Sequence, residues 1–387
     1  MCISKSILLA GLMLLFSYMK GEAQSNTKNT FSEFPKYTVF SAGDDNVNSY
    51  RIPSLLTAKD GSLLVFCEAR RESWQDKSRT DIVVKRSTDN GQTWSVMQDL
   101  TKGTTGAYMD PTPILDSSTG KVFLFTTFWP TDDHSGANNR AILITSDDNG
   151  QSWSAPADVT ASLIPDGRYI YGFGPGAGLQ MVGEKYSGRL ILPARISDTE
   201  RKIAHDVAIF SDNHGETWTV GGNGDTDNEF QIAESPNGVL VYNARVSGAR
   251  MVAYSKDGGM TWSKAVKDPT LPGVSKGCQA SVLGKGAHLY FSGIKGIPET
   301  PEYDERAGLT LYKSCNGGKT WNDSLLLYDK ASGYSCMALL PDERMAIIFE
   351  TADTQSFTRK SLPNIKPLKR PADWLKLDLI LVPIINL

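Results

Sequence analysis

Short apolar runs rich in β-branched residues alternate along the chain with polar turns that contain glycine. Clear examples are residues 81–84, 141–144 and 207–210, which read Asp-Ile-Val-Val, Ala-Ile-Leu-Ile and Val-Ala-Ile-Phe. Runs of this length, bounded by turn residues, predict strands. Residues 374–382 add another strand, because leucines occupy alternate positions there. No long stretch keeps a helical period, so the pattern predicts an all-β protein.

An eight-residue motif follows these strands and recurs along the chain. Its copies start at Ser87, Ser146, Ser211, Ser255 and Ser314, and each ends in tryptophan. The starts are 44 to 65 residues apart, a spacing typical of propellers and repeat arrays. Four-stranded blades of about 60 residues fit this spacing, so we predict a six-bladed β-propeller. In such a ring we expect the strand at residues 374–382 to complete the first blade.

The chemistry of the motif is that of a tight turn. The first copy reads Ser-Thr-Asp-Asn-Gly-Gln-Thr-Trp, and asparagine replaces the aspartate at Asn213 and Asn316 in two other copies. Either side chain accepts hydrogen bonds from nearby backbone amides, glycine supplies a positive φ, and the tryptophan packs beneath the turn. A calcium loop is the alternative, but the EF-hand pattern needs a closing glutamate and flanking helices, which are missing. We therefore interpret the repeats as structural turns.

Composition is that of a soluble globular protein and argues against some classes of partner. The 387 residues include 40 Lys and Arg against 43 Asp and Glu, for a net charge of −3. This balance argues against nucleic acid as a partner, because nucleic-acid-binding surfaces are basic. No CxxC or HExxH spacing is present, so we predict no metal and no other cofactor. The cysteines at positions 67, 278, 315 and 336 are free thiols, or one pair of them forms a disulfide.

The N-terminus has the pattern of a secretory signal. Lys5 precedes an apolar run over residues 6–19, and small residues follow near Ala23. We therefore predict a signal peptide over residues 1–24, an exported protein that is periplasmic or secreted, and a single monomeric domain over residues 25–387. The apolar run is too short to span a bilayer, and no other segment predicts a membrane span. A buried first helix is the alternative interpretation of the run.

The repeated turns are similar to the Asp boxes of sialidases, and a second motif strengthens this resemblance. Residues 50–53 read Tyr-Arg-Ile-Pro and resemble the Phe-Arg-Ile-Pro signature of bacterial sialidases, with tyrosine in place of phenylalanine. The similarity extends over essentially all of the chain after residue 24. It implies exo-α-sialidase activity, which releases terminal α-ketosidically linked sialic acids from glycoproteins, glycolipids and oligosaccharides.

The substrate implied by this resemblance carries a carboxylate on its anomeric carbon. Guanidinium groups suit such a carboxylate, because they are planar, permanently charged and able to bind it through two parallel hydrogen bonds. The resemblance assigns this binding to three arginines, Arg51, Arg245 and Arg306. It also implies a further pocket arginine at Arg70, for which the neighbouring Arg71 is the alternative.

The same carboxylate disfavours an acidic nucleophile, because two anions would have to approach each other. Sialidases are known as the glycoside hydrolases that use tyrosine instead. The resemblance assigns the nucleophile to Tyr334. An unperturbed phenol has a pKa of about 10 and needs a base, and the resemblance assigns that base to Glu229, with Glu234 as the alternative.

A general acid must protonate the leaving glycosidic oxygen and later activate water. The resemblance assigns this function to Asp76, with Asp81 as the alternative. It implies that Glu350 orients the first arginine of the triad and that Asp110 lies near the N-acyl group. The aromatic residues at 129 and 169–173 either contact the substrate or belong to the core of the blades.

Three rival functions share parts of this pattern. A trans-sialidase, or an enzyme that forms an internal anhydro sugar, would use the same core residues. A non-catalytic propeller that binds sialoglycans would keep the fold but not the full catalytic set, which is complete here. A hydrolase acting on a neutral sugar through two carboxylates would leave the arginines and the tyrosine without a function. Sialylated glycans are therefore the partner that we expect.

Overall fold

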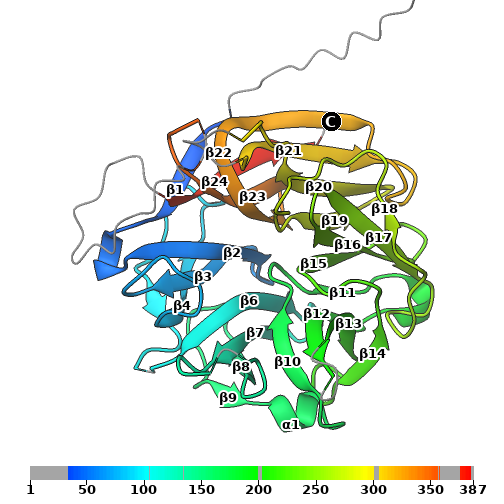
Figure 1. Ribbon diagram of the computed structural model, residues 1–387, viewed down its shortest axis with the longest axis horizontal. Helices are drawn as coiled ribbons and strands as arrows, with labels where there is room; N and C mark the ends of the chain where they lie inside the picture. Colours follow the sequence, from blue (N-terminus) through cyan, green and yellow to red (C-terminus); the bar gives the residue numbers. More distant parts are fainter. Residues whose placement is uncertain are drawn as a thin grey trace, which may run out of the picture.

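The strands of the chain are arranged as blades around a central axis (Figure 1). The computed structural model describes residues 34–103, 105–133, 135–198, 203–299, 305–355, 357 and 375–384. The predicted signal peptide, residues 1–24, lies outside the described residues. Within them, helix is confined to three short segments, which are α1 (Thr160–Leu163), η1 (Asp44–Asn46) and η2 (Glu184–Tyr186). The prediction of an all-β protein is confirmed.

Six blades of antiparallel strands make up the ring, as predicted. Blade 1 contains β2 (Ser49–Thr57), β3 (Leu63–Arg70), β4 (Thr80–Ser87) and β5 (Gln98–Asp99). Blade 2 contains β6 (Ala107–Leu115), β7 (Val122–Trp129), β8 (Arg140–Ser146) and β9 (Ala157–Asp158). Blade 3 contains β10 (Tyr169–Phe173), β11 (Leu179–Gln180), β12 (Leu190–Ser197), β13 (Ala204–Ser211) and β14 (Thr219–Asn223).

The remaining three blades lie in the second half of the chain. Blade 4 contains β15 (Phe230–Glu234), β16 (Leu240–Val246), β17 (Ala249–Ser255) and β18 (Val266–Lys267). Blade 5 contains β19 (Ser281–Lys285), β20 (His288–Ile294), β21 (Ala307–Ser314) and the first part of the long strand β22 (Asp323–Leu339). Blade 6 contains the second part of β22, β23 (Arg344–Thr351), β24 (Lys376–Pro383) and β1 (Lys36–Ser41).

Closure of the ring differs from the expectation drawn from the sequence. β24 pairs along its length with β23 and, on its other side, with β1, so it lies inside blade 6. The prediction that residues 374–382 complete the first blade was therefore wrong. The strand pairs with its neighbour in sequence, as consecutive strands usually do. It is β1, the first strand of the chain, that joins the last blade and closes the ring.

The blades have two ends, which are chemically different. In blade 1 the register pairs Arg70 with Thr80 at one end, here called the front end, and Leu63 with Ser87 at the other. The first Asp box begins at Ser87, so this second end is here called the Asp-box end. The other copies likewise follow β8, β13, β17 and β21, at the same position within their blades.

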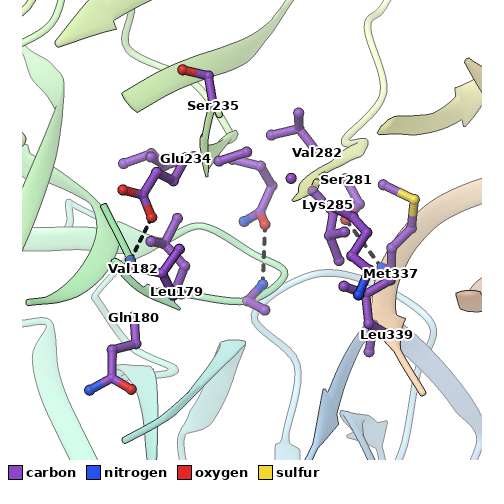
Figure 2. A pocket seen from close by; sticks show the side chains of 18 of the residues that line it. Leu179, Gln180, Val182, Glu234, Ser235, Ser281, Val282, Lys285, Met337 and Leu339 are labelled. Carbon is purple, nitrogen blue, oxygen red and sulfur yellow. Dashed lines mark hydrogen bonds between the residues drawn. The ribbon is translucent and has the colours of Figure 1, made fainter. Parts of the chain in front are cut away.

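A pocket of about 530 Å³ lies on the axis at the Asp-box end (Figure 2). Its walls are the C-terminal ends of the inner strands. They include Thr57, Leu115, Glu234, Lys285 and Leu339 from five different blades. The lining is mostly apolar, so this end of the axis offers little polar chemistry.

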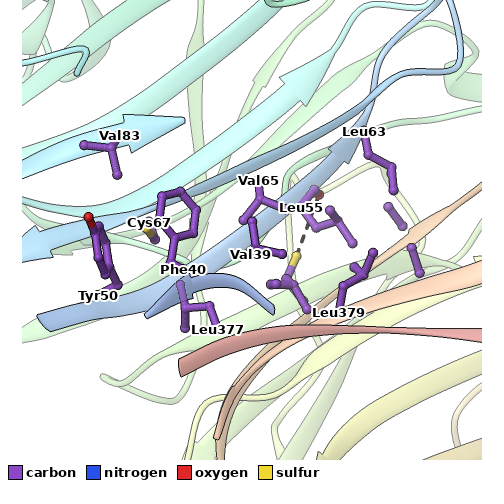
Figure 3. Close-up of a cluster of buried hydrophobic side chains, with 14 of the residues drawn as sticks. Val39, Phe40, Tyr50, Leu55, Leu63, Val65, Cys67, Val83, Leu377 and Leu379 are labelled. Carbon is purple, nitrogen blue, oxygen red and sulfur yellow. Dashed lines mark hydrogen bonds between the residues drawn. The ribbon is translucent and has the colours of Figure 1, made fainter. Parts of the chain in front are cut away.

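Apolar side chains fill the seams between neighbouring blades. The seam between blades 6 and 1 contains Val39, Phe40, Leu55, Leu377 and Leu379, all of them nearly inaccessible to solvent (Figure 3). Strands from both ends of the chain contribute to this seam. Burial of apolar surface therefore stabilises the contact between blades 6 and 1, where the ring closes.

The Asp boxes form tight turns stabilised by their own side chains. In the first copy, Asp89 Oδ1 accepts hydrogen bonds from Ser87 Oγ at 2.7 Å and from the Thr93 amide at 2.9 Å. Hydrogen bonds from Thr93 and Ser87 lower the pKa of Asp89 to about 2. Gly91 has a φ of +86°, and a Cβ there would meet Leu379 Cδ2 at a clashing distance. The carboxylate is thus used within the turn, which agrees with a structural interpretation.

Other features of the described residues bear on the remaining sequence-based expectations. The cysteines at 67, 278, 315 and 336 are all free, so no pair of them forms a disulfide. No helix in the described part of the chain has the length and apolar character needed to cross a membrane. Nor do the described residues contain a group of three or more side chains suited to holding a metal ion.

Candidate active site

Tyr334 and Glu229 are in direct contact at the front end of the ring. Tyr334 lies in the second part of β22, where a register irregularity between Ser332 and Ser335 interrupts the pairing with β23. Its hydroxyl donates a hydrogen bond of 2.5 Å to Glu229 Oε1. Burial, together with the negative charge of Glu229, raises the pKa of Tyr334 well above its usual value. The phenol is therefore protonated, and its contact with a carboxylate provides a route for removing the proton.

Arg245 joins this pair from β16. Its Nη1 lies 2.5 Å from Glu229 Oε2 and 2.7 Å from the Tyr334 hydroxyl. The backbone amide of Arg245 also donates to the carbonyl of Glu229 at 2.8 Å. Tyrosine, glutamate and arginine thus form a closed triangle. The positive charge of the arginine would stabilise negative charge that develops on the phenol oxygen.

Arg51 is held in place by Glu350. Arg51 Nε and Nη2 donate to the two carboxylate oxygens at 2.9 and 3.0 Å, and the Ile52 amide adds a third bond of 3.0 Å. Glu350 is almost fully buried; burial opposes its ionisation, but Arg51 outweighs this effect and lowers the pKa of Glu350. Ile52 has a φ of +55°, which is unusual for a β-branched residue. The backbone is thus strained at the residue that follows Arg51.

Three guanidinium groups surround the ring of Tyr334. The guanidinium carbons of Arg51, Arg245 and Arg306 lie 5.7, 5.9 and 5.7 Å from the ring centroid. Arg51 lies in β2 of blade 1, Arg245 lies in β16 of blade 4, and Arg306 directly precedes β21 of blade 5. The structure therefore brings together all three arginines that the resemblance assigned to one carboxylate.

Asp76 lies in the loop between β3 and β4, at the rim of the same site. Its carboxylate is 2.7 Å from Arg70 Nη2, and its side chain is 68% exposed. Arg70 is buried and makes two further bonds, of 2.8 and 3.0 Å, to Glu68. Partial desolvation at the rim opposes ionisation of Asp76, but the charges of Arg70 and then Arg51 outweigh it, so the pKa of Asp76 is lowered. In the free protein the Asp76 carboxylate is therefore solvent-exposed and ionised.

The alternatives left open for three of these positions lie elsewhere. Arg71 Nε donates to Asp81 at 2.6 Å, and Arg71 also contacts Asp99. Arg71 and Asp81, the alternatives to Arg70 and Asp76, therefore pair with each other, and Asp81 is buried. Glu234, the alternative to Glu229, lines the pocket at the Asp-box end (Figure 2). Its carboxylate accepts hydrogen bonds from the amides of residues 182 and 183 at 2.7 and 2.9 Å.

A strip of charged and aromatic side chains connects the Asp76 loop to Asp110. Lys77 Nζ lies 3.6 Å from the centroid of the Trp129 ring, and Trp129 meets Tyr171 edge to face at 5.4 Å. The guanidinium of Arg195 lies 5.5 Å from the Tyr171 ring and donates to Asp110 Oδ2 at 2.8 Å. Trp129 is buried in a small apolar cluster against which the partly buried Tyr171 packs, and Phe173 is part of a larger core cluster.

Asp110 is buried, and its environment changes its acidity. Burial, and after it the charge of Glu68, raises the pKa of Asp110 to about 7, although Arg195 acts in the opposite direction. Neither Arg195 nor Glu68 was singled out from the sequence. Glu68 precedes Arg70 by two positions in a strand, so both side chains lie on one face of the sheet. This spacing was the sequence signal that could have identified Glu68. Arg195 carried no such local signal.

Comparisons with known proteins agree with this architecture. The family described as BNR repeat-like domain matches residues 107–347, and BNR/Asp-box repeat matches residues 85–96. A sialidase of Bacteroides fragilis is 31% identical over 347 residues, which cover 80% of this chain and 61% of that protein. A sialidase of Paraclostridium sordellii is 31% identical over 282 residues, which cover 66% of this chain and 68% of that protein.

Solved structures show the same likeness. A Hadza microbial sialidase matches with a TM-score of 0.76 and 29% identity, covering 91% of this chain and 69% of that one. The intramolecular trans-sialidase from Ruminococcus gnavus, in complex with oseltamivir carboxylate, matches with a TM-score of 0.70 at 20% identity, covering 90% of this chain and 97% of that one. At that identity the likeness concerns the fold alone. The chain also spans only 61% of the Bacteroides fragilis relative and 50% of a Micromonospora viridifaciens sialidase.

Proposed function

Because the chain belongs to the sialidase family of Asp-box proteins, we propose that it is an exo-α-sialidase with a tyrosine nucleophile. Its substrates would be glycoproteins, glycolipids and oligosaccharides that end in α-linked sialic acid. The single observation that carries the proposal is the buried Tyr334 hydroxyl, bonded to Glu229 and ringed by three guanidinium groups. A neutral nucleophile beside three cations suits a sugar whose reacting carbon bears a carboxylate.

Substrate binding would begin with that carboxylate. Arg51, Arg245 and Arg306 each bring a guanidinium group to between 5.7 and 5.9 Å of the Tyr334 ring centroid. Charge-assisted bonds of this kind are stronger than those between neutral groups. With the carboxylate held there, the anomeric carbon would lie over the phenol oxygen, and the glycosidic oxygen would face the Asp76 loop.

The reaction would then proceed in two displacements. In the first, the Tyr334 oxygen bonds to the anomeric carbon and passes its proton to Glu229, while Asp76 protonates the departing glycosidic oxygen. In the second, Asp76 takes a proton from water, the water oxygen bonds to the anomeric carbon, and the tyrosyl oxygen leaves and recovers its proton from Glu229. Each displacement inverts the anomeric carbon, so the two together retain its configuration.

The charge around Asp76 links binding to the first step. In the free site Arg70 and Arg51 lower the pKa of this carboxylate. The substrate carboxylate would offset the positive charge of Arg51, and the closing of the site by the sugar would remove water. Both effects raise the pKa of a nearby carboxyl group. Asp76 would therefore become a competent acid only when a sialoside occupies the arginines.

We also propose that residues 1–24 direct export of the protein. The proposal is supported by Lys5, the apolar run over residues 6–19 and the small residue at Ala23. N-terminal sequencing of the exported protein tests it, with a new terminus near residue 25 as the expected result. A retained N-terminal methionine in the exported fraction would contradict it.

The activity is tested by assaying residues 25–387 on an α-sialoside of natural linkage, with products identified by mass. The expected product is free sialic acid, and both Tyr334→Phe and Asp76→Asn should lose most of the activity. An anhydro sugar as the product would identify an intramolecular trans-sialidase instead of a hydrolase. A sialic acid transferred to another sugar would identify an intermolecular trans-sialidase. Binding of the sialoside without turnover would identify a non-catalytic sialoglycan-binding propeller instead.

A further inference from the structure

Three successive backbone carbonyls, at residues 276–278, accept hydrogen bonds from three different arginines. The segment lies between β18 and β19. The bonds are Arg245 Nη2 to Lys276 O at 3.0 Å, Arg306 Nη2 to Gly277 O at 3.0 Å, and Arg250 Nη1 to Cys278 O at 2.6 Å. Two of the three donors belong to the proposed carboxylate site. One short piece of backbone therefore contacts both arginines at once.

The segment is anchored on each side. On one side, the carboxylate of Glu305 accepts bonds from the amides of Ser275 and Lys276 at 2.7 and 2.9 Å. On the other side, the buried Arg250 links Cys278 to the side-chain oxygen of Asn243 through a bond of 2.6 Å. The carbonyls at 276 and 277 are thus fixed relative to blade 4 and to the residue that precedes Arg306.

Gly277 occupies a position where any side chain would be strained. Its φ is +66°, and its amide closes a turn on the Val274 carbonyl at 2.8 Å. A Cβ added there would lie 2.8 Å from Arg245 Cγ, 2.9 Å from Arg245 Nε and 2.9 Å from the Val246 carbonyl oxygen. Contacts this short would displace the Arg245 side chain or the turn.

We propose that residues 274–278 position the carboxylate-binding arginines, and that Gly277 is the residue on which this positioning depends. Each carbonyl accepts a hydrogen bond from one guanidinium nitrogen of its arginine and so restricts the orientation of that guanidinium group. The carbonyl oxygens also place partial negative charge beside two like-charged guanidinium groups, which reduces the repulsion between them. The inference rests on the proposed function, because it assumes that Arg245 and Arg306 bind a sialic acid carboxylate.

The test compares Gly277→Ala with Gly248→Ala. Gly248 has a nearly identical φ of +68°, but a Cβ there would meet no atom within 4 Å. Both variants therefore carry the same backbone cost, and only the first disturbs Arg245. The readouts are Tm and the Kd, by calorimetry, of 2-deoxy-2,3-didehydro-N-acetylneuraminic acid and of its methyl ester, which lacks the charged carboxylate.

The expected result is a fall in Tm for both variants that is larger for Gly277→Ala, because only its Cβ meets Arg245 and the Val246 carbonyl, with a loss of affinity confined to that variant. That variant should bind the acid about tenfold more weakly and the ester almost as the unaltered protein does. Equal affinity for the acid in both variants would overturn the inference while leaving the proposed function intact. Failure of the unaltered protein to bind the acid or to release sialic acid would overturn both.

Should Gly277→Ala not fold, Glu305→Gln provides a second comparison. It removes the charge that holds the amides of residues 275 and 276, and its control is Glu343→Gln at the exposed Asp-box end. Weaker binding of the acid, but not of the ester, by Glu305→Gln alone would support the inference. Unchanged binding of the acid would overturn it.

Discussion

Tyr334 and Glu229 meet at 2.5 Å although 105 residues separate them in the chain. Tyr334 belongs to blade 6, and Glu229 directly precedes the inner strand of blade 4. Blade 5 lies between these two blades in the sequence, and its strand β22 continues into blade 6 and carries Tyr334. The proposed catalytic pair therefore depends on how blades 4, 5 and 6 are arranged around the axis.

Removing the proposed base should slow the reaction without unfolding the protein. Glu229→Gln keeps a side chain that can accept a hydrogen bond from Tyr334 but cannot take its proton. We expect kcat to fall by about 100- to 10,000-fold, which is typical for loss of a general base. The measurement is the initial rate of sialic acid release. Glu234→Gln is the matched control at the Asp-box end, and an equal loss in both variants would contradict the assignment.

Glu350 should stabilise the fold in a pH-dependent way. Its pKa is lowered in the folded state, so its charge stabilises the protein above the unfolded pKa of about 4.3 and this contribution is lost as the pH falls below it. Glu350→Gln should lower Tm near neutral pH, since breaking a buried ion pair costs about 3 kcal/mol or more. Between about pH 5 and pH 3 the Tm of the unaltered protein should fall more steeply than that of the variant. Parallel curves would contradict this account.

Lys77 should hold the loop that carries Asp76. Its ammonium lies over Trp129, and the φ of Lys77 is +61°, so the loop is fixed in an unusual conformation. Lys77→Met keeps the aliphatic stem and removes the charge, at a cost of about 0.5–1 kcal/mol.

The readout for Lys77 is the dependence of rate on the leaving group. Release from a sialyl oligosaccharide, which needs protonation by Asp76, should fall by about twofold to fivefold. Release from an aryl sialoside with an acidic phenol, which leaves without help, should barely change. Lys185→Met is the control, because Lys185 Nζ lies 4.9 Å from the Tyr186 ring, away from the site. A loss that is equal for both substrates would argue against a positioning function.

The Asp boxes should govern stability rather than activity. Asp89→Ala removes acceptors for the amide of Thr93 and the hydroxyl of Ser87 and should cost about 1–2 kcal/mol of unfolding free energy. Asp89→Asn should cost less, because Asn213 accepts the equivalent amide bond at 3.0 Å in its own copy. Neither variant should change kcat/KM, and a chelator should leave Tm unchanged. A large fall in Tm with the chelator would favour the calcium alternative.

The sequence predicted the parts of the molecule that are encoded locally. Five repeated turns were sufficient to predict blades, and Arg51 lay in a motif short enough to recognise. Arg195 could not be identified in this way, because its place in the site depends on its contact with Asp110 in the neighbouring blade. No sequence motif near Arg195 indicates that contact. The last strand was assigned to the wrong blade for a related reason. Alternating leucines predict a strand but do not tell which blade that strand joins. The blades on the two sides of a seam present similar apolar side chains.

Covalent trapping tests the central claim most directly. A 2,3-difluorinated sialic acid has a good leaving group at the anomeric carbon, and its second fluorine slows the hydrolysis of any intermediate. Incubation of residues 25–387 with this compound should add the mass of one fluorosialyl group, and fragmentation of the digested protein should place it on Tyr334. Tyr334→Phe should gain no mass. An adduct on a carboxylate, or active protein that forms no adduct, would contradict a tyrosine nucleophile.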